Sequence, residues 1–443
     1  MKFVSTRDTS NSEISFAQAI LNCMPADGGL YVPSTPSDLR RWILYADEKT
    51  SFANLAGTLT SALIHTEFSP IICEAMATRA FTFEPRLVQL SDRFFVLELH
   101  HTPTGSHKDF GIAWLVNCVE TLLTMKESAG IFLDTSGGEL GASLARALRG
   151  KKRIKAIVLY PRGRIRGIRK DDLLENGGNL YPVEIDGTEE DCHAIVRAIF
   201  SMQEFVRVNG ITMANTANIG RLLPQAFFYT FAFSRLKKKI QGDMYYALTP
   251  GNYSNIVAGL YGWQLSLPVN GFIVPATASL TIDPLGKCMV PDSIIPLHER
   301  IAADPASPSN IERLENVFEA YSLMLKNFVF PAPVTDAETY AAGQKLFTQY
   351  GFLADRATSQ AYAAALRNAA IVEEEDGALV LISRDSPALD PMFIMHNFGE
   401  SVFVPENVAT ALLPYTSREI PLLNGNDTDA AVRFIVDAVK RLR

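Results

Sequence analysis

The sequence is poor in the features that mark secreted chains. It holds only five cysteines, namely Cys23, Cys73, Cys118, Cys192 and Cys288. They are scattered, no two form a C-x-x-C pair, and their odd number argues against a disulfide framework. A reducing compartment fits best, so we expect a cytoplasmic protein.

Long apolar runs and long basic runs are also missing. No apolar stretch approaches the length that spans a bilayer, and no apolar segment of a signal peptide follows Met1–Asp8. The formal net charge is −7, so we expect neither a membrane nor a nucleic acid as partner. One local basic cluster, between Lys151 and Lys170, fits either a solvated surface or a site that attracts an anionic substrate.

Two kinds of catalytic site find little support. Three of the seven histidines, His100, His101 and His107, cluster, but no cysteine or carboxylate spacing completes a ligand set, so we expect no metal. The G-x-S-x-G motif of serine hydrolases does not occur. What remains is a chain of 443 residues, 47% of them hydrophobic, which is typical of a globular protein with a large core.

Apolar patterning divides this chain near residue 90. Residues 1–90 carry apolar side chains at helical spacing and give little strand signal. After them, short apolar runs alternate with helical segments, which predicts an α/β fold with parallel sheets covered on both faces. One long helix is expected over Asn215–Leu236, and the proline-rich residues 275–308 predict a long loop. The expected strands are Phe94–Leu99, Ile131–Leu133, Ile154–Tyr160, Leu180–Ile185, Ile211–Ala214, Tyr245–Leu248, Phe272–Val274 and Leu379–Ile382.

Lys108 lies between a predicted strand and a predicted helix. The strand Phe94–Leu99 ends in a turn rich in Pro and Gly, and the helix begins after Lys108. A lysine in that place can lie desolvated at the base of a cleft, beside cations such as His107, which favours the free amine that forms a Schiff base. Most lysines are simply solvated, so the neighbouring motifs decide how much weight this one carries.

The segment Thr249–Asn255 has the form of an anion site. It runs from a predicted strand through a tight turn at Gly251 into a helix that begins near Ser254. The N–H groups at a helix N-terminus are free, and the helix dipole favours negative charge. A phosphate site and an ordinary Asn/Ser-capped helix with nothing bound explain this segment equally well.

A second loop, Asp134–Ala142, also joins a predicted strand to a predicted helix. It is similar to the dinucleotide fingerprint G-x-G-x-x-G, but Ser136 replaces the first glycine, and the next strand leads into Arg162 with no acid to hold a ribose. An NADP-type site with Arg162 or Arg164 on the 2′-phosphate therefore stays open. The other interpretation is a loop that holds a substrate carboxylate or phosphate.

Several segments, in order along the chain, resemble those of the threonine synthases, pyridoxal-phosphate enzymes of the tryptophan-synthase-β type of fold. His101–Gly111 is similar to that family's H-G-P-T-x-x-F-K-D-F-G, and Gly251–Asn255 is similar to its G-N-F-G-N loop. The resemblance begins at Phe3, runs to residue 370 and continues more faintly to the end. The other matching segments are Phe3–Arg7, Ser15–Ala17, Asp27–Pro33, Leu159–Gly163, Ala214–Arg221 and Ser307–Arg313.

This resemblance implies a fold, a cofactor and a reaction. The fold would be the pyridoxal-phosphate fold type II, with two parallel-rich α/β domains behind a mostly helical N-terminal domain, 1–90. Residues 91–125 and 211–443 would form the large domain that holds the cofactor phosphate, and 126–210 the small one. Pyridoxal 5′-phosphate would form a Schiff base with Lys108. That lysine would then carry protons while O-phospho-L-homoserine and water become L-threonine and phosphate (EC 4.2.3.1).

The resemblance and the basic cluster together suggest the remaining site residues. A small phosphorylated amino acid is the expected partner of a monomer or homodimer. Besides Lys108, the expected cofactor-binding residues are Gly251, Asn252, Tyr253, Ser254, Asn255 and Ser383, the last beside the pyridine nitrogen. The expected substrate-binding residues are Thr135, Ser136, Gly137, Asn215, Arg162 and Arg166.

Four segments depart from the family's pattern: 135–141, 276–281, 355–360 and 382–387. The family's T-S-G-D-T-G loop is one residue longer here, and its G-T-A-H-P becomes Ile382-Ser383-Arg384-Asp385-Ser386-Pro387. Changes in buried polar contacts alter specificity strongly, because they leave partners unpaired. Two alternatives therefore stay open: a pyridoxal-phosphate lyase or dehydratase for a different amino acid, and a non-catalytic homologue that binds the cofactor.

Overall fold

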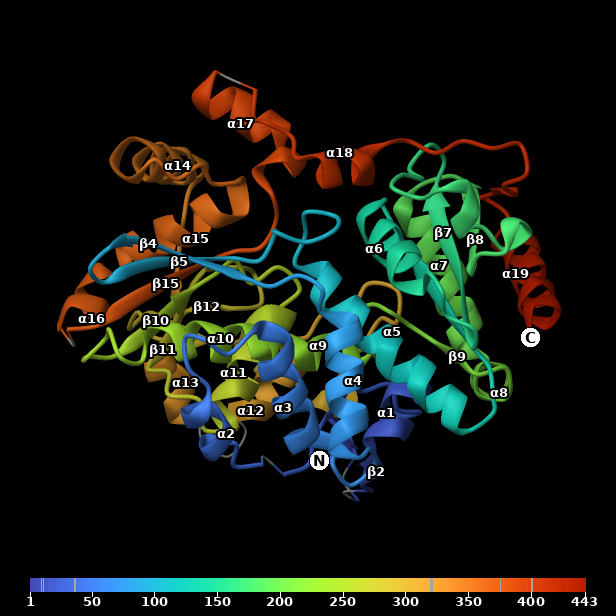
Figure 1. Cartoon of the computed structure of the whole chain (residues 1–443), viewed down its shortest axis with the longest axis horizontal. Helices are drawn as coiled ribbons and strands as arrows, with labels where there is room; N and C mark the ends of the chain where they lie inside the picture. Colours follow the sequence, from blue (N-terminus) through green and yellow to red (C-terminus); the bar gives the residue numbers. More distant parts are fainter. Residues whose placement is uncertain (9, 11, 36, 319–321, 375, 400) are drawn as a thin grey trace.

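Two separate, mostly parallel sheets organise the computed structural model, which describes every residue except 9, 11, 36, 319–321, 375 and 400. The larger sheet lies on the left of Figure 1 and the smaller one on the right. Helix α5 (Lys108–Met125) runs between them. This arrangement confirms the predicted α/β class with parallel-rich sheets.

The larger sheet has the strand order β14-β11-β10-β15-β5-β4. Its first five strands are parallel, and β4 is antiparallel to β5. Tyr246 on β10 packs with α10, whereas its neighbour Tyr245 packs in the core formed with α15, so successive side chains serve opposite faces. The strands are β4 (Arg86–Ser91), β5 (Phe94–Glu98), β10 (Met244–Ala247), β11 (Gly271–Pro275), β14 (Val329–Ala332) and β15 (Ala378–Ser383), and the covering helices are α10 (Ala226–Leu236), α11 (Ser254–Gln264), α14 (Asp336–Tyr350) and α15 (Arg356–Arg367).

The smaller sheet has the order β16-β8-β7-β6-β9 and is parallel throughout. Its strands carry long buried runs, as expected for a parallel sheet covered on both faces. The strands are β6 (Gly130–Thr135), β7 (Ile154–Pro161), β8 (Leu180–Asp186), β9 (Ile211–Thr212) and β16 (Leu422–Asn424), and the accompanying helices are α6 (Glu139–Leu148), α7 (Glu189–Ser201), α8 (Gln203–Val208) and α19 (Thr428–Leu442).

The N-terminal region is mostly helical, as predicted, but it also holds a small antiparallel sheet that the sequence pattern did not reveal. These strands are only two to four residues long, too short for an alternating pattern to show. The elements are β1 (Lys2–Ser5), β2 (Ile14–Ser15), α1 (Phe16–Asn22), β3 (Tyr31–Pro33), α2 (Arg40–Tyr45), α3 (Phe52–Ile64) and α4 (Pro70–Ala80).

Two expectations for the second half of the chain were wrong in detail. The long helix expected over Asn215–Leu236 is broken around Pro224, which lacks the N–H that a continuous helix needs, into α9 (Ile219–Leu222), a 3₁₀ turn and α10. The expected long loop contains a short hairpin, β12 (Thr281–Ile282) and β13 (Cys288–Met289). The remaining helices are α12 (Ile311–Phe318), α13 (Ser322–Phe328), α16 (Ala369–Glu374), α17 (Pro391–Phe398) and α18 (Glu406–Leu412).

The C-terminal segment returns to the smaller sheet. After α18 the chain crosses the top of the molecule in Figure 1 and ends in β16 and α19. β16 pairs with β8, and β9 pairs with β6, although both strands fall in the predicted large-domain range 211–443. The three-domain division stays a prediction, and these pairings would move both strands to its small domain. None of the described helices combines the length and apolar composition that a membrane crossing requires.

Candidate active site

Lys108 is the first residue of α5, at the end of a tightly bonded loop that follows β5. Thr102 Oγ1 donates to the Ser106 carbonyl and accepts from the Ser106 N–H, both at 3.0 Å. Gly105, between them, has φ +74°, a conformation that glycine adopts without strain. Ser106 Oγ then accepts from the Lys108 N–H at 3.3 Å. The loop therefore fixes the backbone from which the Lys108 side chain extends.

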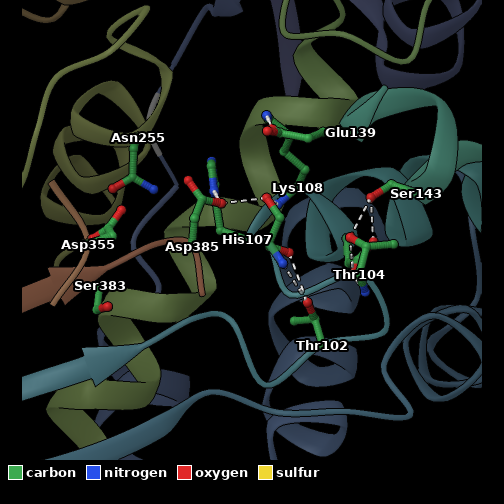
Figure 2. A network of polar contacts seen from close by, with 12 residues as sticks. Thr102, Thr104, His107, Lys108, Glu139, Ser143, Asn255, Asp355, Ser383 and Asp385 are labelled. Atoms are coloured by element: carbon green, nitrogen blue, oxygen red, sulfur yellow. Dashed lines mark hydrogen bonds and ion pairs between the residues drawn. The ribbon is translucent and has the colours of Figure 1, made fainter. Parts of the chain in front are cut away.

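The Lys108 ammonium faces a carboxylate rather than a group of cations. Its Nζ donates a hydrogen bond to Glu139 Oε2 at the start of α6, as Figure 2 shows. The other Glu139 oxygen lies 3.6 Å from Arg166 Nη2. Burial lowers the pKa of His107 to about 4, so His107 is neutral near pH 7. The expectation that His107 adds a positive charge beside Lys108 was therefore wrong.

The two residues that precede Lys108 converge on Asp385. Ser106 Oγ donates to Asp385 Oδ1 at 2.5 Å, and His107 Nδ1 lies 3.2 Å from the same oxygen. Burial opposes ionisation of Asp385, but His107, Lys108 and Arg384 together hold its pKa well below the usual range. An anionic Asp385 thus fastens the lysine loop to the end of β15.

A second buried carboxylate connects the lysine helix to the smaller sheet. Asp109 accepts from the N–H and the hydroxyl of Thr104, at 2.7 and 2.9 Å, and from the Ser143 hydroxyl on α6 (Figure 2). Burial raises the pKa of Asp109, while these hydrogen bonds act in the opposite direction. The network holds α6, and with it Glu139, in register with Lys108.

The expected anion loop leads from β10 into α11 through two residues in the left-handed region. Gly251 has φ +54° and Tyr253 has φ +66°. Tyr253 is the N-cap residue of α11 and its side chain forms no cap hydrogen bond, but Asn252 Oδ1 accepts from the Ser254 N–H at 3.3 Å. Asn252 thus supplies an asparagine contact of the kind that the Asn/Ser-capped interpretation expects, and the phosphate site stays a prediction. After Ser254, the N–H groups of Asn255 and Ile256 are those that an anion can use.

The two asparagines of this loop, Asn252 and Asn255, hold it in place through hydrogen bonds to neighbouring segments. Asn255 is buried, its Oδ1 accepts from the Tyr229 hydroxyl at 2.7 Å, and its Nδ2 donates to Gln225 at 3.1 Å. Asn252 Nδ2 donates to Thr216 at 2.8 Å. Because these amides already have partners, we assign the binding of an anion to backbone N–H groups, with the asparagines as supports.

Ser383 ends β15 at the same edge of the larger sheet. It is buried and accepts from the Thr358 hydroxyl at 3.3 Å. Asp355 is the N-cap residue of α15, the helix that contains Thr358, and it accepts from the Thr358 N–H at 2.9 Å. Burial, and then the charge of Asp385, raise the pKa of Asp355 to about 6. Ser383 is thus a neutral hydroxyl with a fixed direction, as the expected contact with a ring nitrogen requires.

The second loop, between β6 and α6, is organised by Ser136. Its Oγ accepts from the N–H groups of Gly138 and Gly141, both at 2.9 Å, so Ser136 acts as an internal cap. Those N–H groups are then not available to a dinucleotide, which argues against the NADP-type interpretation. Thr135 and Gly137 flank Ser136, and Thr135 is buried. Their contact with substrate stays a prediction.

The remaining predicted substrate-binding residues do not lie together in the structure. They are Arg162, Arg166 and Asn215. Arg166 lies against the second loop and next to Glu139. Arg162 is exposed and pairs with Asp186 at 3.4 Å, outside this group of contacts. Asn215 donates to the Pro305 carbonyl at 2.8 Å and accepts from the Ala217 N–H at 2.9 Å, so it fixes its own loop. Of the three, only Arg166 is brought toward Lys108 through Glu139.

Sequence reasoning missed Glu139, Asp385 and Arg384 as site residues. All three lie in the segments that depart from the family pattern, and those departures were the sequence signal from which they could have been found. Arg221, which lies in a matching segment, was also missed. It is buried among Asp109, Asp134 and Asp385, and burial lowers its pKa to about 10.

Glu98, His100 and His101 are the described residues that come closest to a metal-ligand set. Glu98 accepts from His101 at 2.8 Å and lies 3.8 Å from Arg86, so its charge is already balanced. Burial lowers the pKa of His100 to about 4. These contacts explain the cluster as an ion-pair group, and the absence of a metal stays a prediction.

Together these residues suit a cofactor with a phosphate, a carbonyl carbon and a ring nitrogen. The N-terminus of α11 suits the phosphate, Lys108 suits the carbonyl carbon, and the buried hydroxyl of Ser383 suits the nitrogen. Arg384 Nε, a buried donor with no partner, suits an anion. Such a site at the ends of parallel strands, between two α/β units, defines a pyridoxal-phosphate enzyme of fold type II.

The comparisons with known proteins agree. The chain belongs to the pyridoxal-phosphate dependent enzymes, whose family model matches residues 83–384, and its cofactor is pyridoxal phosphate. The model of the threonine synthase N terminus matches residues 2–81. Threonine synthase from Escherichia coli K12 is 28% identical over 426 residues, which are 95% of this chain and 97% of that protein.

Solved structures extend the likeness to the whole fold. The crystal structure of threonine synthase from Escherichia coli aligns with a TM-score of 0.77 at 25% identity, over 99% of this chain and 100% of that one. The pyridoxal-phosphate-bound threonine synthase from Brucella melitensis aligns with a TM-score of 0.81 at 20% identity, over 100% and 99%, and supports the fold alone.

Proposed function

We propose that this protein is a threonine synthase, a carbon–oxygen lyase that converts O-phospho-L-homoserine and water to L-threonine and phosphate. The observation that carries the proposal is the likeness to threonine synthases over the full length, with the threonine synthase N terminus at residues 2–81. A likeness limited to the cofactor-binding part of the chain would not indicate which amino acid is the substrate. The likeness here includes the N-terminal region, and this favours threonine synthase over a lyase or dehydratase for another amino acid.

Bound pyridoxal phosphate supplies an electron sink for the substrate carbons. Lys108 Nζ carries protons between those carbons, and Glu139 accepts its hydrogen bond when it is protonated. The rigid loop from Thr102 to Lys108 keeps Nζ on one side of the site, which suits a reaction that moves several protons on one face. The α11 N-terminus binds the cofactor phosphate, and the Ser383 hydroxyl orients the ring.

Arg166 binds the phosphate of the substrate in this proposal. It is held beside Glu139 at 3.6 Å, and its side chain is one-third exposed, so it can exchange a carboxylate partner for an incoming phosphate. Thr135 and Gly137 face the substrate carboxylate from the second loop. Ser136 supports that loop through its bonds to Gly138 and Gly141.

We also infer that the enzyme works in the cytoplasm as a monomer or homodimer, with a small phosphorylated amino acid as its partner and neither nucleic acid nor membrane. All five cysteines are free and buried, which suits a reducing compartment. The net charge of −7 disfavours binding to nucleic acid. Size-exclusion chromatography with light scattering distinguishes monomer from dimer.

The decisive assay offers the purified enzyme O-phospho-L-homoserine and, separately, L-serine and L-threonine. The proposal expects phosphate and threonine from the first and no keto acid from the other two. Keto acid from serine or threonine, without phosphate release from O-phospho-L-homoserine, identifies a dehydratase instead. A protein that takes up the cofactor but turns over none of the three is the non-catalytic alternative.

A further inference from the structure

Arg384 carries a charged donor that is buried without a partner. It follows Ser383 directly at the end of β15, and its Nε is inaccessible to solvent and has no hydrogen-bond partner. Asp355 and Asp385 are near enough to feel its charge. Neither carboxylate forms an ion pair with it among the described residues. An uncompensated guanidinium donor inside a protein is costly, which points to a missing acceptor.

The guanidinium of Arg384 extends to the loop in front of α11. Its Nη1 lies 3.0 Å from the position that a Cβ would take on Gly251. Its charge also acts on Tyr229, whose hydroxyl donates to Asn255 of the same loop. Any side chain at position 251 would press on the guanidinium, so the glycine leaves room for it. Arg384 therefore brings a positive charge to the loop that leads into the N-terminus of α11.

We propose that Arg384 binds the phosphate of pyridoxal phosphate together with the N–H groups of α11. The planar fork of a guanidinium matches two phosphate oxygens, and charge-assisted bonds of this kind are stronger than neutral ones. The phosphate supplies the acceptor that Nε lacks. The arginine adds a charged contact to a site otherwise built from backbone groups.

The neighbouring Asp385 completes the arrangement. Asp385 is an anionic carboxylate bonded to Ser106 and His107. Its negative charge lies near the Arg384 cation, while its bonds fasten the lysine loop. Arg384 and Asp385, which are adjacent in the sequence, thus connect the phosphate end of the cofactor site to the end that holds Lys108. This assignment requires only the cofactor of the family and is independent of which amino acid is the substrate.

Cofactor binding tests this assignment directly. Apo-enzyme is titrated with pyridoxal phosphate and with pyridoxal, which lacks the phosphate, and the absorbance of the bound aldehyde gives each dissociation constant. Arg384→Met should weaken pyridoxal phosphate about 10- to 100-fold and leave pyridoxal within about twofold. Arg384→Lys should recover part of the loss. The matched control is Arg433→Met, at an exposed arginine on α19, which should bind both aldehydes like the wild type.

Three results would overturn the assignment. They are an equal loss for both aldehydes, no loss for either, and tighter binding of pyridoxal phosphate by Arg384→Met. The last would mean that the arginine obstructs the site. Circular dichroism and thermal melting establish that each variant is folded. If Arg384→Met does not fold, the ratio of the two dissociation constants in Arg384→Lys decides in the same way. Because the readout is binding, a wild type that binds the cofactor but makes no threonine contradicts the proposed reaction and not this contact.

Discussion

The ammonium of Lys108 donates a hydrogen bond to Glu139, and the other oxygen of that carboxylate lies 3.6 Å from Arg166. Two cations with proposed roles, Lys108 in proton transfer and Arg166 in binding the substrate phosphate, thus share one anion. The Lys108 and Glu139 side chains are 33% and 38% exposed, so water screens the pair and it can separate during turnover.

Replacing Glu139 with glutamine tests that arrangement. The change keeps the shape of the side chain and removes the charge that competes with substrate for Arg166. We expect the KM for O-phospho-L-homoserine to fall about two- to fivefold, as for a partly exposed ion pair. Steady-state kinetics of phosphate release measure it. A higher KM would show instead that Glu139 contacts the substrate favourably.

Arg166 and Arg162 form a matched pair, because the sequence predicted both and the structure places only one near the site. Arg166→Met should raise the KM for O-phospho-L-homoserine about 10- to 100-fold through loss of a charged phosphate contact. Arg162→Met should stay within about twofold, since Arg162 pairs with Asp186 on the surface. Equal effects of the two changes, measured by the same phosphate assay, would remove the assignment of Arg166.

Lys108→Ala should abolish both the visible absorbance of the lysine-bound cofactor and the activity. The matched control is Lys126→Ala, at the exposed residue that follows the last turn of the same helix, which should keep both. Absorbance spectra of the purified proteins with added pyridoxal phosphate provide the measurement. An unchanged band in Lys108→Ala would place the cofactor on another amine.

The buried carboxyl group of Asp355 should make the free energy of unfolding depend on pH. Its pKa is raised to about 6, mainly by burial, so the folded protein holds this proton more tightly than the unfolded chain. Burying the ionised carboxylate costs free energy of folding. This cost is absent below the unfolded pKa of about 4 and complete above the folded pKa. Asn at position 355 keeps a cap acceptor for Thr358 and has no charge to bury.

We therefore expect Asp355→Asn to gain stability relative to wild type as pH rises, by up to about 3 kcal/mol between pH 4 and pH 7. Urea unfolding of both proteins at the two pH values measures the gain. A relative loss of stability over the same interval would mean that the ionised carboxylate is stabilised in the fold.

Local signals were enough to predict the elements that present the cofactor-binding residues. The strand before Lys108 and the strand–turn–helix at Gly251 are contiguous in sequence, and their hydrophobic runs and turn residues predicted them. Short or unusual elements escaped this reasoning. β14 contains Pro331 and lies at the edge of its sheet, where a missing N–H is tolerated, so its pattern does not look like a strand.

Partnerships between distant residues could not be predicted from the sequence. Glu139 meets Lys108, and Asp385 meets Ser106, only because α6 and β15 lie against the lysine loop. Conversely, Asn255 has the residue type expected of a phosphate ligand, yet its amide is used by Tyr229 and Gln225. Residue type suggested the chemistry in each case, and packing decided which group performs it.

The most direct test of the proposed reaction follows the oxygen atom of water. The enzyme is given O-phospho-L-homoserine in water labelled with heavy oxygen, and mass spectrometry locates the label in threonine and in phosphate. A carbon–oxygen lyase that adds water should place one labelled oxygen in each threonine and release an equal amount of unlabelled phosphate. Label in the phosphate with unlabelled homoserine as the product, or no threonine from enzyme that has bound its cofactor, would contradict it.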